Sequence, residues 1–160
     1  MTNKTIIYLA IAILIGGGLI WLTSQSSETP SPTAATGTTA SLKAEVSQYD
    51  FGTIDINGGD VTTEFPVTNT GEEPIIVVDG TTSCACTSAE IEGVGFDMHK
   101  GMNSKVTIEP GETKTLTATY DPLFHGPNGT GKITREVILK TNSVVTPEVR
   151  VRFAANVVKN

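Results

Sequence analysis

The sequence predicts an all-β domain, an immunoglobulin-like two-sheet sandwich of seven or eight strands, preceded by one N-terminal transmembrane helix. From Leu42 onward, short apolar or alternating runs are separated by Gly, Pro and Asn turn signals. Thr, Val, Ile and Gly are plentiful in these runs, a composition typical of strands and turns rather than helices. Ahead of this region, one long uncharged run extends from Ile6 to Leu22.

The uncharged run has nearly the length that a membrane span requires. At about 1.5 Å per residue it covers roughly 25 Å, against roughly 30 Å for a bilayer core. Lys4 precedes the run and Trp21 lies at its far end. The positive-inside tendency therefore places residues 1–5 in the cytoplasm and everything after an anchor of residues 6–23 outside. A cleaved signal peptide is the alternative, although Ser24-Gln25-Ser26 is a poor cleavage site.

The anchor is followed by a linker and then by an acidic domain. Residues 24–41 are rich in Ser, Thr, Pro, Ala and Gly, and such a segment cannot bury a core, so it predicts a flexible tether. Residues 42–160 form the expected extracytoplasmic domain. The chain has a formal net charge of −6 and no basic patch with interleaved aromatics, which argues against a nucleic-acid partner. The expected partners are the membrane, through the single-pass anchor, and a protein of the cell envelope.

The expected strands follow one another along this domain. Between Val61 and Val67, alternate side chains share one face and predict a half-buried strand. Pro66 cannot donate a ladder hydrogen bond, which predicts that this strand lies at a sheet edge there. The expected strands are Lys43–Phe51, Thr53–Ile56 after Gly52, Val61–Thr68, Pro74–Val78, Lys105–Ile108, Lys114–Tyr120, Thr134–Thr141 and Glu148–Val157.

Five short motifs of the domain carry a resemblance to a known family. They are Tyr49–Ile54 (YDFGTI), Phe65–Gly71 (FPVTNTG), Ser83–Thr87 (SCACT), Ile108–Glu112 (IEPGE) and Lys140–Asn142 (KTN). From about Ala44 to Val157 the chain resembles the bacterial domain-of-unknown-function family 1573 (DUF1573). The resemblance implies an immunoglobulin-like domain of the Hydin and major-sperm-protein type in an exported or membrane-tethered protein, and it implies no biochemical activity. Ala85 departs from the glycine that is usual in the family's Cys-x-Cys-Thr motif.

The only two cysteines, Cys84 and Cys86, lie one residue apart. In an extended strand their Cα atoms would be roughly 6.5–7 Å apart, at or beyond the limit for an unstrained disulfide, so a bridge needs a local kink. Free thiols outside the cytoplasm oxidise unless they are buried, paired or metallated. Three alternatives follow: a soft-metal site, a disulfide or redox-active pair, and two packing residues or a merely structural bridge.

The metal alternative rests on the residue types near the cysteines. Thiolate and thioether ligands select Cu(I), and imidazole also suits copper. The redox alternative lacks an evident positive partner that would lower a thiol pKa. His125 either approaches the cysteines or caps carbonyls of its own turn-rich loop, the interpretation that the loop favours. Arg135 opens the next strand, where a structural role is expected. The candidate metal ligands are Cys84, Cys86, Met98, His99, Met102 and His125.

The functional expectation is a non-enzymatic binding or structural module of the cell envelope, anchored in the membrane, which contacts a protein through an exposed strand edge. The alternative is a copper-binding or copper-handling envelope domain, or a thiol-redox pair, centred on Cys84 and Cys86. No serine nucleophile elbow, phosphate-binding loop or metalloprotease helix is present in the sequence. An enzyme is therefore not expected.

Overall fold

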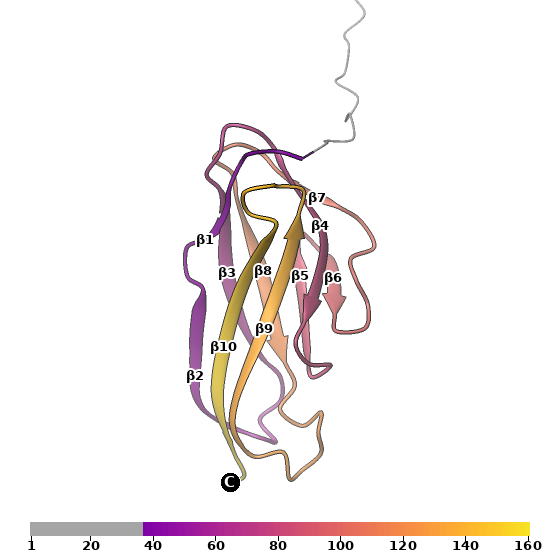
Figure 1. The fold of residues 1–160 in the computed structure, drawn as a ribbon. Coiled ribbons are helices and arrows are strands. Elements are labelled where there is room, and N and C mark those ends of the chain that lie inside the picture. The colour runs from indigo at the N-terminus through magenta and orange to yellow at the C-terminus, as the bar shows by residue number, and fades with distance from the viewer. Residues whose placement is uncertain (1–36) are drawn as a thin grey trace, which may run out of the picture. The chain divides into compact units, whose positions relative to one another are not determined.

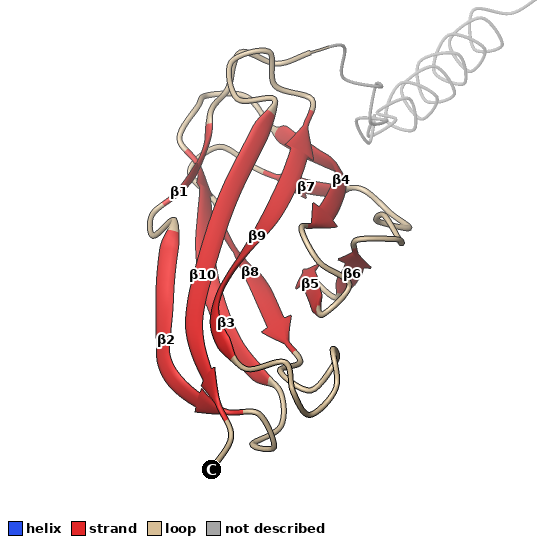
Figure 2. Cartoon of the chain, turned by 60° about the horizontal axis from the view of Figure 1, so that its bottom comes forward, coloured by secondary structure: helices blue, strands red, loops and turns tan. Residues whose placement is uncertain are grey.

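The computed structural model describes residues 37–160, which form two five-stranded β-sheets that pack face to face (Figure 1). Strands connected by loops make up this whole range (Figure 2). The predicted all-β sandwich is confirmed, but the described part of the chain has ten strands rather than the seven or eight expected. No helix in residues 37–160 has the length and apolar character of a membrane span. The predicted cytoplasmic segment, anchor and most of the linker lie outside the described residues.

The two sheets combine strands from the whole length of the domain. Within them, β2 runs parallel to β10, and all the other pairs are antiparallel. The first sheet has the order β1 (Leu42–Ala44), β3 (Val61–Asn69), β8 (Thr113–Tyr120), β5 (Thr87–Ile91), β6 (Val94–Asp97). The second has the order β2 (Gln48–Asp55), β10 (Glu148–Val158), β9 (Gly131–Thr141), β4 (Ile75–Thr82), β7 (Val106–Ile108).

The core lies between the sheets and is filled by the alternating residues that the sequence indicates. In β3, Phe65 and Val67 are fully buried while Glu64 is exposed. In β10, Val151 and Phe153 are buried in the same alternation. Strands such as β3 and β10 bury one face only, and their exposed faces carry Thr, Glu and Arg side chains, as expected for a sandwich with two solvated outer faces.

The segment predicted as one strand from Lys43 to Phe51 is divided between the two sheets. β1 pairs with β3, and β2 pairs with β10 in the other sheet. The backbone N–H of Glu45 still donates to Pro66, whereas that of Arg152 donates to Ser47, so the chain changes sheets between these two residues. Gly52, with φ +70°, does not end the second strand but lies in it beside a register shift of β10, as in a β-bulge.

A hairpin that the sequence analysis did not predict follows the cysteines. β5 and β6 are joined by Glu92 and Gly93 alone, and both have positive φ (52° and 74°). Positive φ at both central residues is typical of a type I′ turn, which matches the twist of a two-stranded hairpin. The hairpin extends the first sheet beyond β8.

The described chain begins at the opposite end of the sandwich from the cysteines. Thr38 bridges to Ser143, which follows β9, and Ala40 is buried, so contacts with the sandwich start ahead of the expected boundary at Leu42. Arg135, near the beginning of β9, lies eight residues before Ser143. At about 3.4 Å per residue, the two ends are separated by roughly 27 Å.

Candidate functional site

Cys84 and Cys86 form a disulfide in the turn between β4 and β5. Their Cα atoms are 5.2 Å apart, closer than in an extended strand, because the chain reverses there and the backbone N–H of Thr87 donates to the carbonyl of Cys84 at 3.0 Å. The local kink that a bridge requires is therefore present. The sequence analysis left a metal site, a disulfide and two packing residues open for these cysteines, and the structure contains the disulfide.

Hydrogen bonds from three directions hold this turn in place. The hydroxyl of Thr82 lies 3.0 Å from the carbonyl oxygen of Cys84 and 2.9 Å from that of Thr87. The backbone N–H of Glu136 in β9 donates to the hydroxyl of Ser83 at 2.9 Å. The backbone N–H of Asp121, at the end of β8, donates to the carbonyl of Cys86. Both sheets thus fix the position of the disulfide at this end of the sandwich.

The two sulfur-bearing residues differ in their access to solvent. Cys86 is 2% exposed and belongs to the hydrophobic core, whereas Cys84 is half-buried at its margin. The backbone N–H of Cys86 donates to the Sγ of Cys84 at 3.2 Å. An external reagent can therefore reach the Cys84 side of the bridge more easily than the Cys86 side.

Arg135 supplies the positive charge that the sequence analysis did not find. Its Nε donates to the Sγ of Cys86 at 3.1 Å, and one terminal nitrogen donates to the carbonyl of Thr134 at 2.9 Å. The guanidinium also lies over the ring of Tyr120, 5.8 Å from its centroid. Burial raises the pKa of Tyr120 above its ordinary value of 10.0, an effect that the Arg135 charge opposes. Arg135 is thus fixed between an aromatic face and a sulfur atom.

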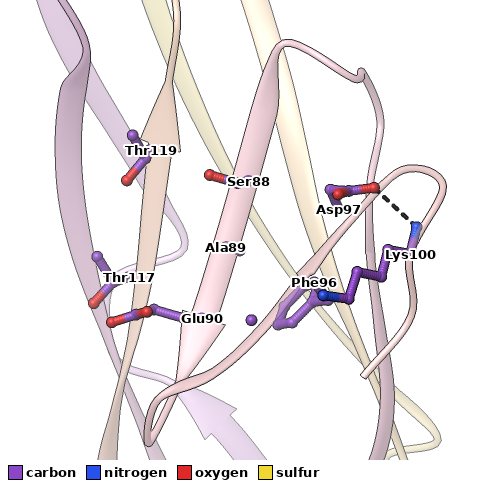
Figure 3. Close-up of a pocket in the computed structure, with 9 residues that line it drawn as sticks. Ser88, Ala89, Glu90, Phe96, Asp97, Lys100, Thr117 and Thr119 are labelled. Atoms are coloured by element: carbon purple, nitrogen blue, oxygen red, sulfur yellow. Dashed lines mark hydrogen bonds between the residues drawn. The ribbon is translucent and has the colours of Figure 1, made fainter. Parts of the chain in front are cut away.

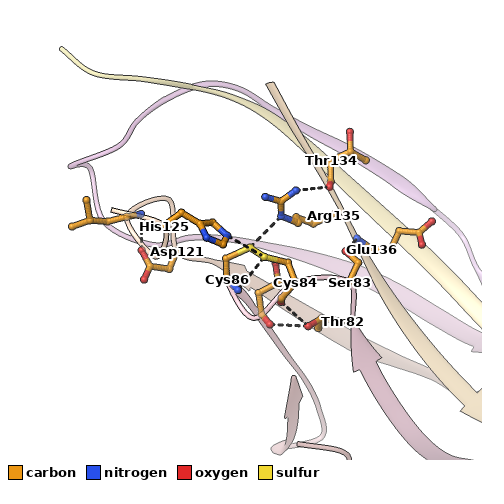
Figure 4. Close-up of a disulfide and its surroundings, with 11 residues drawn as sticks. Thr82, Ser83, Cys84, Cys86, Asp121, His125, Thr134, Arg135 and Glu136 are labelled. Carbon is orange, nitrogen blue, oxygen red and sulfur yellow. Dashed lines mark hydrogen bonds between the residues drawn. A yellow bond between two sulfur atoms is a disulfide. The ribbon is translucent and has the colours of Figure 1, made fainter. Parts of the chain in front are cut away.

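His125 reaches the other sulfur. Its Nε2 lies 3.4 Å from the Sγ of Cys84, and the ring makes an edge-on contact with Phe124. The loop after β8 is shaped by consecutive turns, in which the N–H of Leu123 donates to the Asp121 carboxylate and that of Gly126 to Leu123. Figure 4 shows the side chains of His125 and Arg135 pointing toward the two bonded sulfurs. The ring therefore approaches the cysteines, contrary to the loop-capping role that the sequence favoured.

The remaining candidate ligands lie on the segment between β6 and β7. Within residues 37–160, the metal-type group with ligand atoms within 4.8 Å of one another consists of Cys84, Cys86 and His125, and His99 is not part of it. The backbone N–H of His99 donates to the Asp97 carboxylate. Met98 is 48% exposed, and Met102 packs against the core.

Two shallow pockets lie on the outer faces of the sheets. The larger, of about 440 Å³, lies over β5, β6 and β8 and is lined by side chains such as Glu90, Asp97 and Thr117 (Figure 3). Hydrogen bonds from the backbone N–H groups of His99 and Lys100 lower the pKa of Asp97, so this carboxylate is engaged within its own turn. The second, of about 330 Å³, lies over β2, β9 and β10. Neither of these two linings includes a cysteine, histidine or arginine.

Similarity to solved structures supports the fold. A protein of unknown function from Porphyromonas gingivalis W83 is 18% identical, with a TM-score of 0.59 over 78% of this chain and 50% of that one. The VesB protease of Vibrio cholerae is 14% identical, with a TM-score of 0.50 over 74% of this chain and 32% of that one. The chain thus spans half the length of the first structure and about a third of the second. The ASH/PapD-like domain 7 of human CEP192 is 13% identical, with a TM-score of 0.45 over 86% and 97% of the two chains.

The comparison with curated proteins gives no match. The model of the family described as "Protein of unknown function (DUF1573)" matches residues 42–157. This range includes all ten strands except the last residue of β10, together with the disulfide, His125 and Arg135. The chain therefore belongs to the DUF1573 family.

Proposed function

We propose that this chain is a membrane-anchored, extracytoplasmic module of the cell envelope whose disulfide exchanges with thiols of a partner protein. The domain is of the Hydin and major-sperm-protein type of immunoglobulin-like sandwich, and it acts as a stoichiometric redox partner rather than as an enzyme. The observation that carries the proposal is the contact of the Arg135 guanidinium with the buried sulfur of Cys86 at 3.1 Å. A positive hydrogen-bond donor on a sulfur stabilises the thiolate that forms when the disulfide opens.

Exposure and charge together set the direction of the first step. A partner thiolate attacks the accessible Sγ of Cys84 along the sulfur–sulfur axis, forming a mixed disulfide and expelling Cys86 as a thiolate. The electron pair of the broken bond stays on the Cys86 sulfur, where Arg135 donates to it. The His125 Nε2, 3.4 Å from the Cys84 sulfur, is positioned to accept the proton of the incoming thiol.

The second step completes a two-electron exchange. The partner's second thiol, as a thiolate, attacks the partner sulfur in the mixed disulfide and releases Cys84. The partner dithiol has then lost two electrons and two protons, which reduce the bridge to two thiols. The partner required is therefore a protein that presents two nearby thiols in one state and their disulfide in the other.

Exposed apolar side chains beside the site support a protein as this partner. Leu123 and Phe124 are 46% and 51% exposed, and they immediately precede His125. A docked protein would cover them and hold its own sulfur near Cys84. The site also lies at the end of the sandwich opposite Thr38, so the first described residues of the chain do not cover it.

The test measures the reduction potential of the bridge and the contribution of Arg135. The full-length chain in a mild detergent is equilibrated with dithiothreitol redox buffers at pH 7, and its free thiols are trapped with a maleimide and counted by mass. A hydrogen bond to a charged group contributes about 1.5–3 kcal/mol. Because Arg135 is partly exposed, we use about 1.4 kcal/mol, so Arg135→Gln should make the potential roughly 30 mV more negative.

Arg150→Gln is the matched control, because Arg150 is an exposed arginine of β10 that pairs with Glu148 and Glu136. It should leave the potential at the wild-type value. A bridge that stays oxidised across all the buffers would overturn the proposed function. An Arg135→Gln potential equal to that of the wild type would overturn the role given to the guanidinium.

A further inference from the structure

We infer that the reduced form of this site binds one thiophilic cation of the Cu(I) class between Cys84, Cys86 and His125. The inference rests on the proposed function, because the bridge must open before its sulfurs can act as thiolate ligands. It adds a second state to the site: an oxidised form that exchanges with thiols and a reduced form that holds a metal ion. Redox state then decides which chemistry the same three side chains perform.

The ligand atoms already have the required spacing on the histidine side. The Sγ and Nε atoms of the three residues lie within 4.8 Å of one another, and the Cys84 sulfur is 3.4 Å from the His125 Nε2. A sulfur and a nitrogen bound to one ion at about 2.3 and 2.0 Å, with a near-tetrahedral angle, lie about 3.5 Å apart. The imidazole therefore needs almost no displacement to share an ion with Cys84.

Opening the bridge supplies the third ligand. Two sulfurs on one ion lie about 4 Å apart at such bond lengths, so the bonded pair must separate. The Cα atoms of Cys84 and Cys86 are 5.2 Å apart and held in one turn, which keeps both sulfurs on the same side after reduction. Cys86 is buried and accepts a hydrogen bond from Arg135, whereas Cys84 is half-buried beside His125.

The donor set and the charges favour a soft monovalent ion. Within residues 37–160, no carboxylate belongs to the group, so the hard oxygen ligands that calcium, magnesium and manganese prefer are missing from it. Thiolates favour Cu(I), and a zinc ion held by these three side chains would need a water molecule as its fourth ligand. When Cu(I) displaces the two thiol protons, the bis-thiolate complex carries one negative charge, and the Arg135 guanidinium lies where it balances that charge.

The experiment uses the full-length chain in a mild detergent, reduced and handled without oxygen. Its mass first verifies the gain of two hydrogens. Cu(I) is then titrated in competition with bicinchoninate, and the adduct is counted by native mass spectrometry. We expect one Cu(I) per reduced chain and none on the oxidised chain. Cys84→Ser and Cys86→Ser should each weaken binding by more than the roughly 10–100-fold caused by losing an outer hydrogen-bond partner of a ligand.

The two histidines provide a matched pair of variants, because the chain has only His99 and His125. His125→Ala should weaken Cu(I) binding at least tenfold and remove the nitrogen contribution from the copper X-ray absorption spectrum. His99→Ala should change neither. Both residues lie in loops, so far-UV circular dichroism should match the wild type and exclude misfolding as the cause.

The possible failures are distinguishable from one another. A chain that is verified as reduced but yields all its Cu(I) to the chelator overturns the metal inference and leaves the thiol-exchange function standing. A bridge that cannot be reduced overturns both. Tight binding of Zn(II) without Cu(I) overturns the assignment to the Cu(I) class, and equal Cu(I) affinity in His125→Ala overturns the histidine as a ligand.

Discussion

The two sulfurs of the bridge meet different surroundings, and this difference has chemical consequences at the scale of single residues. Cys84 faces the exposed His125, while Cys86 is buried and held by Arg135. A thiolate that is both accessible and hydrogen-bonded reacts faster than one that is only hydrogen-bonded. The asymmetry therefore favours Cys84 as the sulfur that a partner thiolate attacks and that the second step releases.

Alkylation of the reduced chain tests this asymmetry. We expect a limiting amount of iodoacetamide to place the large majority of its first label on Cys84, because Cys86 is only 2% exposed. Peptide mapping by mass spectrometry measures the distribution. In urea, where both thiols are accessible, the preference should disappear. Equal labelling in the folded chain would mean that Cys86 is not protected and that the assignment of entry and leaving sulfurs is wrong.

Gly80 is a second residue whose environment makes a sharp prediction. A Cβ at this position would lie 2.6–2.7 Å from three ring atoms of Phe96, which is 3% exposed. Because the ring is enclosed by the core, it cannot move away freely, and overpacking of this kind costs about 1–3 kcal/mol. Gly80→Ala should lower the free energy of unfolding by that amount, as measured by urea denaturation followed by circular dichroism.

Gly95→Ala is the control for this prediction. It also places alanine in a strand, but the nearest atom to its Cβ would be the carbonyl oxygen of Ala89 at 3.9 Å. Its urea midpoint should equal or slightly exceed that of the wild type, since glycine weakens a strand interior. Equal loss of stability in both variants would attribute the effect to backbone changes rather than to Phe96.

At the scale of elements, the turn from β7 to β8 is closed by reciprocal bonds between two glutamates. The backbone N–H of Glu112 donates to the carbonyl of Glu109, and the N–H of Glu109 donates to the Glu112 carboxylate at 2.8 Å. The pKa of Glu112 lies below its ordinary value of 4.5, mainly because of this hydrogen bond and to a smaller extent because of the pairing with Lys114. Gly111, with φ +74°, completes the turn in a conformation that glycine adopts readily.

The lowered pKa predicts a dependence of stability on acid. Well above pH 4.5 the Glu112 carboxylate is ionised in the folded and unfolded chains, and its stabilising contribution is complete. As the pH falls through 4.5 the unfolded chain takes up the proton first, and the contribution is fully lost once the pH has fallen through the lower folded-state pKa. Glu112→Gln should therefore be less stable than the wild type at pH 7 and show a smaller decrease below pH 4.5.

Urea midpoints between pH 2.5 and 7 measure this difference. Glu109→Gln changes the other glutamate of the same turn without removing the carboxylate that accepts the hydrogen bond, so it should keep the acid-sensitive decrease. If Glu112→Gln and the wild type lose stability in parallel, Glu112 does not contribute to the acid response.

The elements that could be predicted from the sequence are those whose burial alternates along a single strand. Val137 and Leu139 in β9, like Leu116 and Ala118 in β8, follow the expected pattern and are buried. The β5–β6 hairpin was missed because its turn contains Glu92 at positive φ, a residue that carries no turn signal. The division of Lys43–Phe51 into β1 and β2 depends on which sheet offers a partner, and local periodicity does not report that choice.

In the candidate site, too, features that depend on neighbouring residues could be predicted from the sequence, whereas contacts between distant residues could not. The closeness of Cys84 and Cys86, and the need for a local kink if they are bridged, follow from neighbouring residues, but the sequence leaves the disulfide open beside a metal site and unbonded packing residues. Arg135 lies 49 residues beyond Cys86 and reaches it only because β9 pairs with β4. His125 lies 41 residues beyond Cys84, on a loop whose direction is set by its own turns. No spacing rule connects residues at such separations before the sheets are assembled.

At the scale of the whole molecule, the sandwich separates the site from the point where the described chain begins. Thr38 lies beside Ser143 after the end of β9, and Arg135 lies near its beginning, roughly 27 Å away. Under the proposed topology, with residues 6–23 as the anchor, the bridge lies on the outer side of the membrane. Disulfides persist in that oxidising compartment and are rare in the cytosol, so location and chemistry agree.

Labelling of intact cells tests this arrangement directly. Cells that express the full-length chain are treated with a membrane-impermeant phosphine and then with an impermeant maleimide. Because the proposed topology puts Cys84 and Cys86 outside, we expect labelling before lysis, mainly on the more accessible Cys84, and labelling should require the phosphine since the bridge is oxidised there. Cys84→Ser/Cys86→Ser, which removes both cysteines of the chain, is the background control. Labelling that appears only after lysis and needs no phosphine would place the domain in the cytoplasm with reduced thiols, and the proposed localisation would then be wrong.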